Sequence, residues 1–95
     1  MTNLAIIGVG NIGFRHLEGI TKSKIIEKIF IYEPNYLAIE KIKGSKFFNS
    51  SIKICENITE LPEILDFCII ATDSRNRLKA ISSLVSKVKQ IKYII

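Results

Sequence analysis

Short apolar runs alternate with segments of mixed polarity along the 95-residue chain. Runs rich in β-branched and aromatic residues are typical of strands, and this pattern predicts strands over Leu4–Val9, Lys28–Glu33, Ile52–Cys55, Asp66–Thr72 and Ile91–Ile95. The first and fourth of these runs are almost wholly apolar, which indicates strands that are covered on both faces. The third has the weakest pattern of the five.

The segments between these runs carry the signals of helices. Helices are predicted over about Asn11–Lys22, Asn35–Lys43 and from Asp73 or Ser74 to about Lys87. Pro34 suits the start of the second helix and Gly44 its end. The segment "ITELPEIL" is expected to form a short helix or turn. Strands that alternate with helices predict an α/β fold, with a parallel sheet covered on both faces and joined by right-handed crossovers.

Three glycines follow the first strand in the pattern Gly8-x-Gly10-x-x-Gly13. Between a strand and a helix, this spacing is typical of a turn that binds a dinucleotide. The first glycine allows a tight turn, the second lets backbone approach a pyrophosphate, and the third lets the helix pack close to the sheet. The N–H groups near Asn11 and Ile12, at the start of the helix, are expected to face the phosphates.

Glu33 closes the second strand, twenty residues after Gly13. An acid at this distance can accept hydrogen bonds from an adenosine ribose, although taken alone it can equally be a solvated charge. The combined pattern predicts a Rossmann-type sheet of about five strands, in the order 3-2-1-4-5, over a single dinucleotide-binding domain of residues 1–95. Because a carboxylate repels a 2′-phosphate, and because Pro34 and Asn35 supply no cation, NAD is favoured over NADP.

The end of the fourth strand is the second place where a cofactor is expected to bind. Ligands of open parallel sheets lie at the carboxyl ends of the strands, near the point where the strand order reverses. Thr72, Asp73 and Ser74 are therefore candidate cofactor contacts, while Asp73 or Ser74 can also simply cap the next helix. Arg15 either reaches a phosphate or is a solvated residue of the first helix.

Composition argues against other classes of ligand. The net charge is +5, but the lysines are spread singly along the chain, so no nucleic-acid partner is expected. Cys55 and Cys68 are too far apart for a C-x-x-C pair and only one histidine is present, so we expect no metal site and two small core residues. Because signal-peptide and membrane-span patterns are lacking, a cytoplasmic protein is predicted.

With His16 included, the glycine stretch reads "GVGNIGFRH". Together with "YEPN" and "FCIIATDS", it resembles the N-terminal domain of the glucose–fructose oxidoreductase and inositol dehydrogenase family, across essentially the whole chain. The family has proline and histidine where this chain has Asp73 and Arg77, which indicates an unusual substrate or an offshoot branch. We expect His16 to hold the glycine turn by a hydrogen bond rather than to act in catalysis.

The resemblance implies the NAD-binding portion of an oxidoreductase that transfers a hydride between a nicotinamide cofactor and a sugar or polyol. Family members carry a Glu-Lys-Pro motif after the fifth strand and a separate domain that holds the substrate and provides oligomer contacts. Neither lies within these 95 residues. We therefore expect the chain to belong to a longer, homo-oligomeric enzyme and to be inactive alone, with no catalytic residue of its own. The alternative is a non-enzymatic nucleotide-sensing module.

Overall fold

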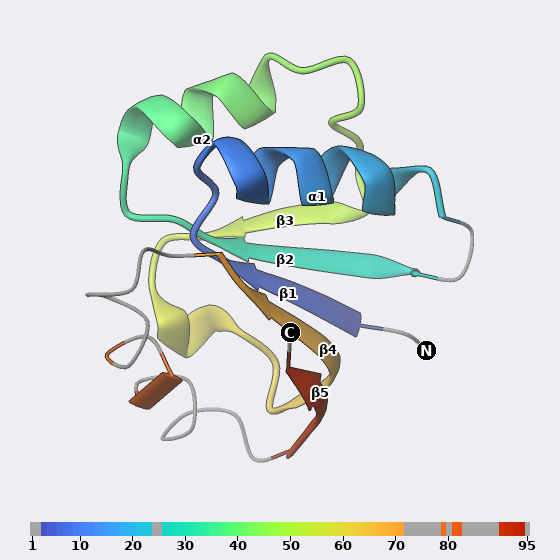
Figure 1. The fold of residues 1–95 in the computed structure, drawn as a ribbon, viewed down its shortest axis with the longest axis vertical. Helices are drawn as coiled ribbons and strands as arrows, with labels where there is room; N and C mark the ends of the chain where they lie inside the picture. The colour runs from blue at the N-terminus through green and yellow to red at the C-terminus, as the bar shows by residue number, and fades with distance from the viewer. Residues whose placement is uncertain (1–2, 24–25, 72–78, 80, 83–89, 95) are drawn as a thin grey trace.

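The computed structural model describes residues 3–23, 26–71, 79, 81–82 and 90–94. Strands and helices alternate along the chain (Figure 1). The elements are β1 (Asn3–Ile7), α1 (Asn11–Thr21), β2 (Lys28–Tyr32), α2 (Tyr36–Lys43), β3 (Ile52–Cys55), the 3₁₀-helix η1 (Ile58–Glu60), β4 (Ile64–Ile70) and β5 (Gln90–Ile94).

The strands form one sheet in the order β3-β2-β1-β4-β5. Each neighbouring pair is parallel. The α/β class and the predicted order of the strands are therefore confirmed. β1 lies at the centre, where Ala5 is paired with Phe30 of β2 on one side and with Cys68 of β4 on the other.

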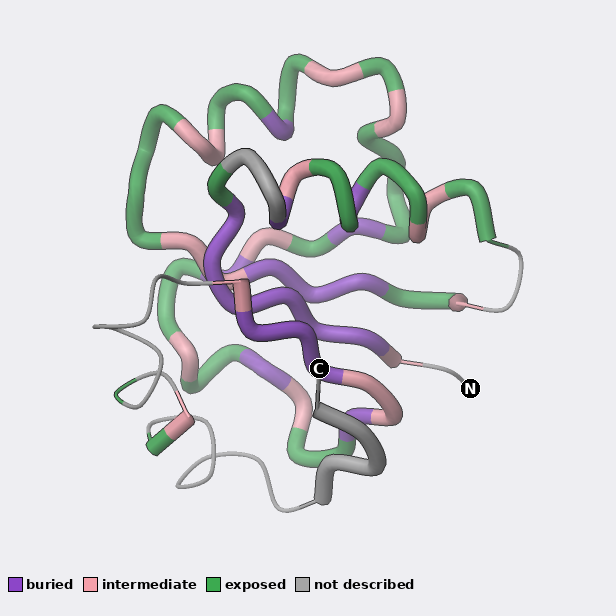
Figure 2. The backbone as a smooth tube through the Cα atoms, in the orientation of Figure 1, coloured by how far each residue is buried: buried purple, intermediate pink, exposed green. Residues whose placement is uncertain are grey.

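The central strands are mostly apolar because both faces of the sheet are covered, and Figure 2 shows most of their length as buried. Successive side chains of β1 point to opposite faces, so Leu4 and Ile6 join one cluster while Ala5 and Ile7 join the other. Cys68 belongs to the second cluster, where it is fully buried. The expectation that the cysteines are small core residues is confirmed, since Cys55 is fully buried as well.

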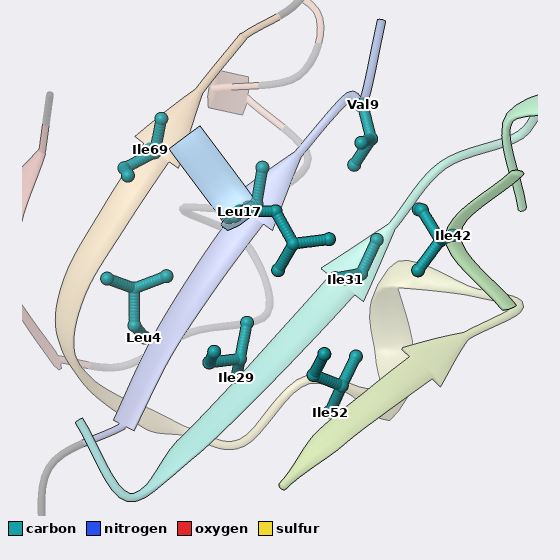
Figure 3. Packing of buried hydrophobic residues seen from close by; sticks show 9 residues of the cluster. Leu4, Val9, Leu17, Ile29, Ile31, Ile42, Ile52 and Ile69 are labelled. Carbon is teal, nitrogen blue, oxygen red and sulfur yellow. The ribbon is translucent and has the colours of Figure 1, made fainter. Parts of the chain in front are cut away.

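Helices α1 and α2 cover the first face of the sheet. Leu17 of α1 and Ile42 of α2 are both fully buried there, against the isoleucines of β2 (Figure 3). The ring centroids of Phe14 and Phe47 lie 5.2 Å apart, and the Nζ of Lys41 lies 4.4 Å from the centre of the Phe14 ring. These contacts tie α1 to α2 and to the loop that follows α2.

The second face is covered by η1 and by residues between β4 and β5. Ile58 and Ile81 pack against its apolar cluster, and residues 79, 81 and 82 have helical backbone. Helical segments thus lie on both faces, as predicted. The rest of the predicted third helix lies outside the described residues.

Several strand boundaries differ from the prediction by one or two residues, and two of these differences have a clear physical reason. The apolar run that opens the chain was expected to be strand as far as Val9, but β1 ends at Ile7 because Gly8 turns the backbone with a φ of 88°. β4 begins two residues before the predicted start at Asp66. Ile64 and Leu65, expected in a helix or turn, instead pair with β5. Only pairing with a strand distant in sequence reveals their extended conformation.

Candidate functional site

The candidate site lies where the carboxyl ends of the three central strands meet. Hydrogen bonds extend both ladders of β1 by one residue: the Gly8 N–H donates to the Tyr32 carbonyl at 2.8 Å, and the Ala71 N–H donates to the Ile7 carbonyl at 2.9 Å. The glycine turn is thereby held between the ends of β2 and β4. The strand order reverses beside β1, which is where open parallel sheets bind their ligands.

Gly8 makes the turn out of β1. Its φ of 88° lies in the left-handed region, and no other described residue has a positive φ. A side chain in this conformation brings its Cβ too close to the backbone, at a cost of roughly 1–2 kcal/mol. The predicted reason for the first glycine, a tight turn, is therefore confirmed.

Gly13 brings α1 close to the turn. A Cβ at this position would lie 2.6 Å from the carbonyl oxygen of Gly8 and 3.3 Å from the Cβ of Ala71. The first distance is shorter than any tolerated carbon–oxygen contact, and the atom it meets belongs to the backbone. Only glycine allows the helix to approach the strand end this closely, as predicted for the third position.

Gly10 differs from both of these glycines. Its φ is −81°, which suits any residue. Among the described residues, a Cβ at Gly10 would meet nothing within 4 Å. Neither backbone conformation nor packing among the described residues therefore requires a glycine here. The open space at the N-cap of α1 is where the sequence predicts a pyrophosphate.

The N-terminus of α1 presents polar backbone at this open position. Gly10 is the N-cap and has no side chain to accept a hydrogen bond, and the first helical bond runs from the Phe14 N–H to the Gly10 carbonyl at 2.8 Å. The N–H groups of the first turn have no carbonyl one turn earlier. Asn11 and Ile12 begin this turn, so their backbone lies where it was expected. An anion there would also be favoured by the helix dipole.

Glu33 joins the glycine turn to the start of α2. Its Oε1 accepts a hydrogen bond from the Val9 N–H at 2.6 Å, and its Oε2 accepts one from the Asn35 N–H at 2.8 Å. Asn35 in turn is the N-cap of α2 and accepts from the Leu37 N–H at 2.9 Å. The half-buried carboxylate is thus held against the turn by backbone donors on both sides.

A carboxylate has about four acceptor positions on its two oxygens. The two backbone bonds to Glu33 occupy one position on each oxygen. Two more hydroxyl or amide donors can therefore bind it without displacing the protein's own bonds. The sequence pattern did not indicate the contact between Val9 and Glu33, because residues twenty-four positions apart meet only through sheet pairing.

A groove of about 410 Å³ continues beyond Glu33, between α2 and the end of β3. Its walls carry Tyr36, Ile39, Phe48 and Ile54, together with Lys43 and Glu56. Lys43 was not among the predicted site residues. The only signal for it was helical spacing, since residues 36, 39 and 43 share one face of α2. The hydroxyl of exposed Tyr36 bonds to Glu40, which raises its pKa.

The remaining candidates lie elsewhere. Thr72, Asp73 and Ser74 fall outside the described residues. Arg15 and His16 are exposed on α1 and line a second groove, of about 440 Å³, with Leu4 and Phe67. The hydrogen bond by which His16 was expected to hold the glycine turn, to a neighbouring strand or loop, is not found among the residues that the structure describes.

Two searches of the described residues bear on other classes of function. No group of three or more histidine, cysteine, aspartate or glutamate side chains comes close enough together to hold a metal ion within these ranges. In the same part of the chain, no helix has the length and apolar character needed to cross a membrane.

The chain was compared with known proteins by its sequence. No protein-family model matches it, and a search of curated proteins returns no match. The interpretation of the site therefore depends on its geometry.

Proposed function

We propose that this chain is the NAD-binding portion of an oxidoreductase that acts on a sugar or polyol, as in the glucose–fructose oxidoreductase and inositol dehydrogenase family. The pyrophosphate would lie on the backbone of Gly10–Ile12 and the adenosine ribose on Glu33. The substrate would be held by residues outside the described part of the chain. We propose the Rossmann-type assignment of the fold on the same grounds.

The observation that carries this proposal is the difference between the three glycines. Gly8 and Gly13 are explained by the turn and by helix packing, whereas the described residues give no reason of their own for a glycine at position 10. A ligand that must touch the backbone supplies that reason. The position coincides with the first N–H groups of α1, so an anionic ligand is favoured over a neutral one.

Glu33 supports a nucleoside at the next position along the sheet edge. Its two unused acceptor positions match the two hydroxyl donors of a ribose. Since the Val9 N–H holds this carboxylate on the glycine turn, phosphate and ribose sites are adjacent, as a dinucleotide requires. A 2′-phosphate at the same place would meet a negative charge, so NAD is preferred over NADP.

The contribution of this chain to a reaction would be binding and orientation. NAD supplies the hydride chemistry when it is bound. The glycine turn and Glu33 would hold its adenosine half across the ends of β1 and β2. The nicotinamide half would then point toward β4 and β5, on the other side of the position where the strand order reverses.

The test is a titration of the purified chain with NADH and with NADPH, followed by cofactor fluorescence. We expect NADH to bind about tenfold more tightly, a difference of about 1.4 kcal/mol. Equal or reversed affinities would contradict the assignment of Glu33 to the ribose.

A matched pair of variants separates ligand contact from helix effects. Gly10→Val and Gly19→Val introduce the same side chain at the start and near the end of α1, and a Cβ meets nothing within 4 Å at either position. Both variants should keep their helical circular dichroism. Gly10→Val should weaken NADH binding at least about tenfold, while Gly19→Val should bind as the unmodified chain does. Normal binding by Gly10→Val would exclude a pyrophosphate at this turn.

A further inference from the structure

The groove beside Glu33 brings together charges that are far apart in the sequence. Glu33 directly follows β2, Lys43 lies at the end of α2, and Glu56 follows β3, yet all three line the same space of about 410 Å³. Figure 1 shows α2 on the same side of the sheet as α1, and Ile54 of β3 lines the groove together with residues of α2. The groove is therefore a continuation of the proposed ribose site, toward the edge of the sheet.

Lys43 reaches this groove because of helical geometry. Tyr36, Ile39 and Lys43 follow one another at spacings of three and four residues along α2, so one face of the helix forms one wall of the groove. A lysine ammonium on its long flexible stem can approach any anion that enters from the Glu33 end. This cation lies ten residues after Glu33 in the sequence, so the residues next to Glu33 do not reveal it.

The balance of charge at this wall bears on whether the adenosine ribose of a bound nucleotide can carry a 2′-phosphate. A phosphate monoester carries about −1.5 to −2 charges near neutral pH. In the groove it would face the carboxylates of Glu33 and Glu56 and the ammonium of Lys43. The carboxylates disfavour the 2′-phosphate, and Lys43 offsets part of that repulsion.

We propose that Lys43 is a specificity-determining residue that opposes Glu33. It limits the discrimination against NADPH in the unmodified chain, and it is the cation that receives a 2′-phosphate once the charge of Glu33 is removed. This inference depends on the proposed function, because it concerns the nucleotide that the glycine turn binds. It predicts that one substitution at Glu33, with no cation added, shifts the preference toward NADPH.

The charge of Lys43 also acts on the end of α2, and a matched control separates this structural role from an effect on the bound nucleotide. Lys41 and Lys43 both lie in the last turn of α2, where positive charge stabilises the helix end. Lys41 instead contacts the ring of Phe14, at 4.4 Å from its centre. Lys41→Met therefore removes the same charge from the same helix end, without touching the groove.

The experiment measures dissociation constants for NADH and NADPH with the full 95-residue chain and its variants Glu33→Gln, Lys43→Met, Lys41→Met and the double variant at positions 33 and 43. Glu33→Gln should bind NADPH about tenfold more tightly, and the double variant should lose most of that gain. Lys43→Met alone should weaken NADPH binding about fivefold and leave NADH within about twofold. These differences should shrink at 1 M salt, where charges are screened beyond about 3 Å.

The outcomes distinguish this inference from the function on which it depends. If the unmodified chain binds neither dinucleotide, the proposed function fails and the inference fails with it. If NADH binds but Lys43→Met affects NADPH no more than Lys41→Met does, only the inference is overturned. An equal loss of both cofactors in Lys43→Met would overturn it too. Lys43→Met leaves the hydrogen bonds of Glu33 in place, so this comparison stands even if Glu33→Gln folds poorly.

Discussion

Gly8, Gly10 and Gly13 share the absence of a side chain, but only Gly8 and Gly13 are required by a constraint among the described residues. Gly8 adopts a left-handed backbone conformation, and Gly13 faces the carbonyl oxygen of Gly8. Gly10 has an ordinary φ and open space. Substitutions at Gly8 and Gly13 should therefore affect stability, whereas those at Gly10 should affect ligand binding.

Gly13→Ala tests the close approach of α1. Its Cβ would lie 2.6 Å from a backbone oxygen, so the helix must move away from the turn. We expect the free energy of unfolding to fall by about 1–3 kcal/mol, as for other overpacked sites, measured by urea denaturation.

Gly8→Ala tests the left-handed conformation at the end of β1. It should lower the free energy of unfolding by about 1–2 kcal/mol in the same measurement, because an alanine is strained at the positive φ of this position.

Gly19→Ala is the control for these two variants. It lies on the exposed side of α1, and a Cβ there has no neighbour within 4 Å. Alanine is the better helix former, so stability should be unchanged or higher by up to about 1 kcal/mol. A Gly13→Ala variant as stable as this control would show that the backbone of the turn moves to accommodate the added Cβ at little cost.

Among the elements, η1 depends on a single carboxylate. Glu60 accepts hydrogen bonds from the backbone N–H groups of Asn57, at 3.1 Å, and of Glu56. These bonds stabilise the charged form and lower the pKa of Glu60 below its ordinary value of 4.5. A carboxyl group with a lowered pKa in the folded state stabilises the protein above its unfolded pKa, and this stability is lost as the pH falls through the folded pKa.

At pH 7, Glu60→Gln should therefore have a lower free energy of unfolding than the unmodified chain. Well below pH 4.5, the two should have nearly the same free energy of unfolding. Urea denaturation across this pH range measures the effect. Glu18→Gln, which removes an exposed acid from α1, is the matched control. If both variants show the same pH dependence, the hydrogen bonds to Glu60 contribute no stability.

For the molecule as a whole, packing on the second face of the sheet excludes solvent from both thiols, which lie in the same apolar cluster. Cys55 and Cys68 are on strands three places apart in the sheet, and each has no exposed surface. Burial raises the pKa of Cys68 to about 12 and also raises that of Cys55. Since the thiolate is the reactive form, both groups should be inert in the folded chain at neutral pH.

Labelling by a disulfide reagent tests this expectation. In native buffer both thiols should react slowly, at a rate that follows the unfolded fraction and rises about tenfold for each 1.4 kcal/mol of stability removed by urea. The unfolded chain, in which both thiols should react at once, is the reference. Rapid native labelling of either cysteine would mean that its face of the sheet opens without global unfolding.

Much of this fold could be predicted from local sequence. A strand covered on both faces needs apolar residues over most of its length, as in β1, and a helix start needs a capping residue such as Asn35. These are properties of neighbouring residues. Parallel strands joined by helices then leave few possible topologies, which is why the order of the strands could be predicted.

Local sequence predicted most of each strand, helices α1 and α2 and the position of the glycine turn, because periodicity and backbone conformation depend on neighbouring residues. Long-range packing alone shows that a contact among the described residues requires a glycine at position 13 but not at position 10, and that Ile64 and Leu65 belong to β4. It also brought Glu33 onto the Val9 N–H and Lys43 into the adjoining groove. Such contacts join residues far apart in the chain, and their geometry depends on how the sheet and helices pack.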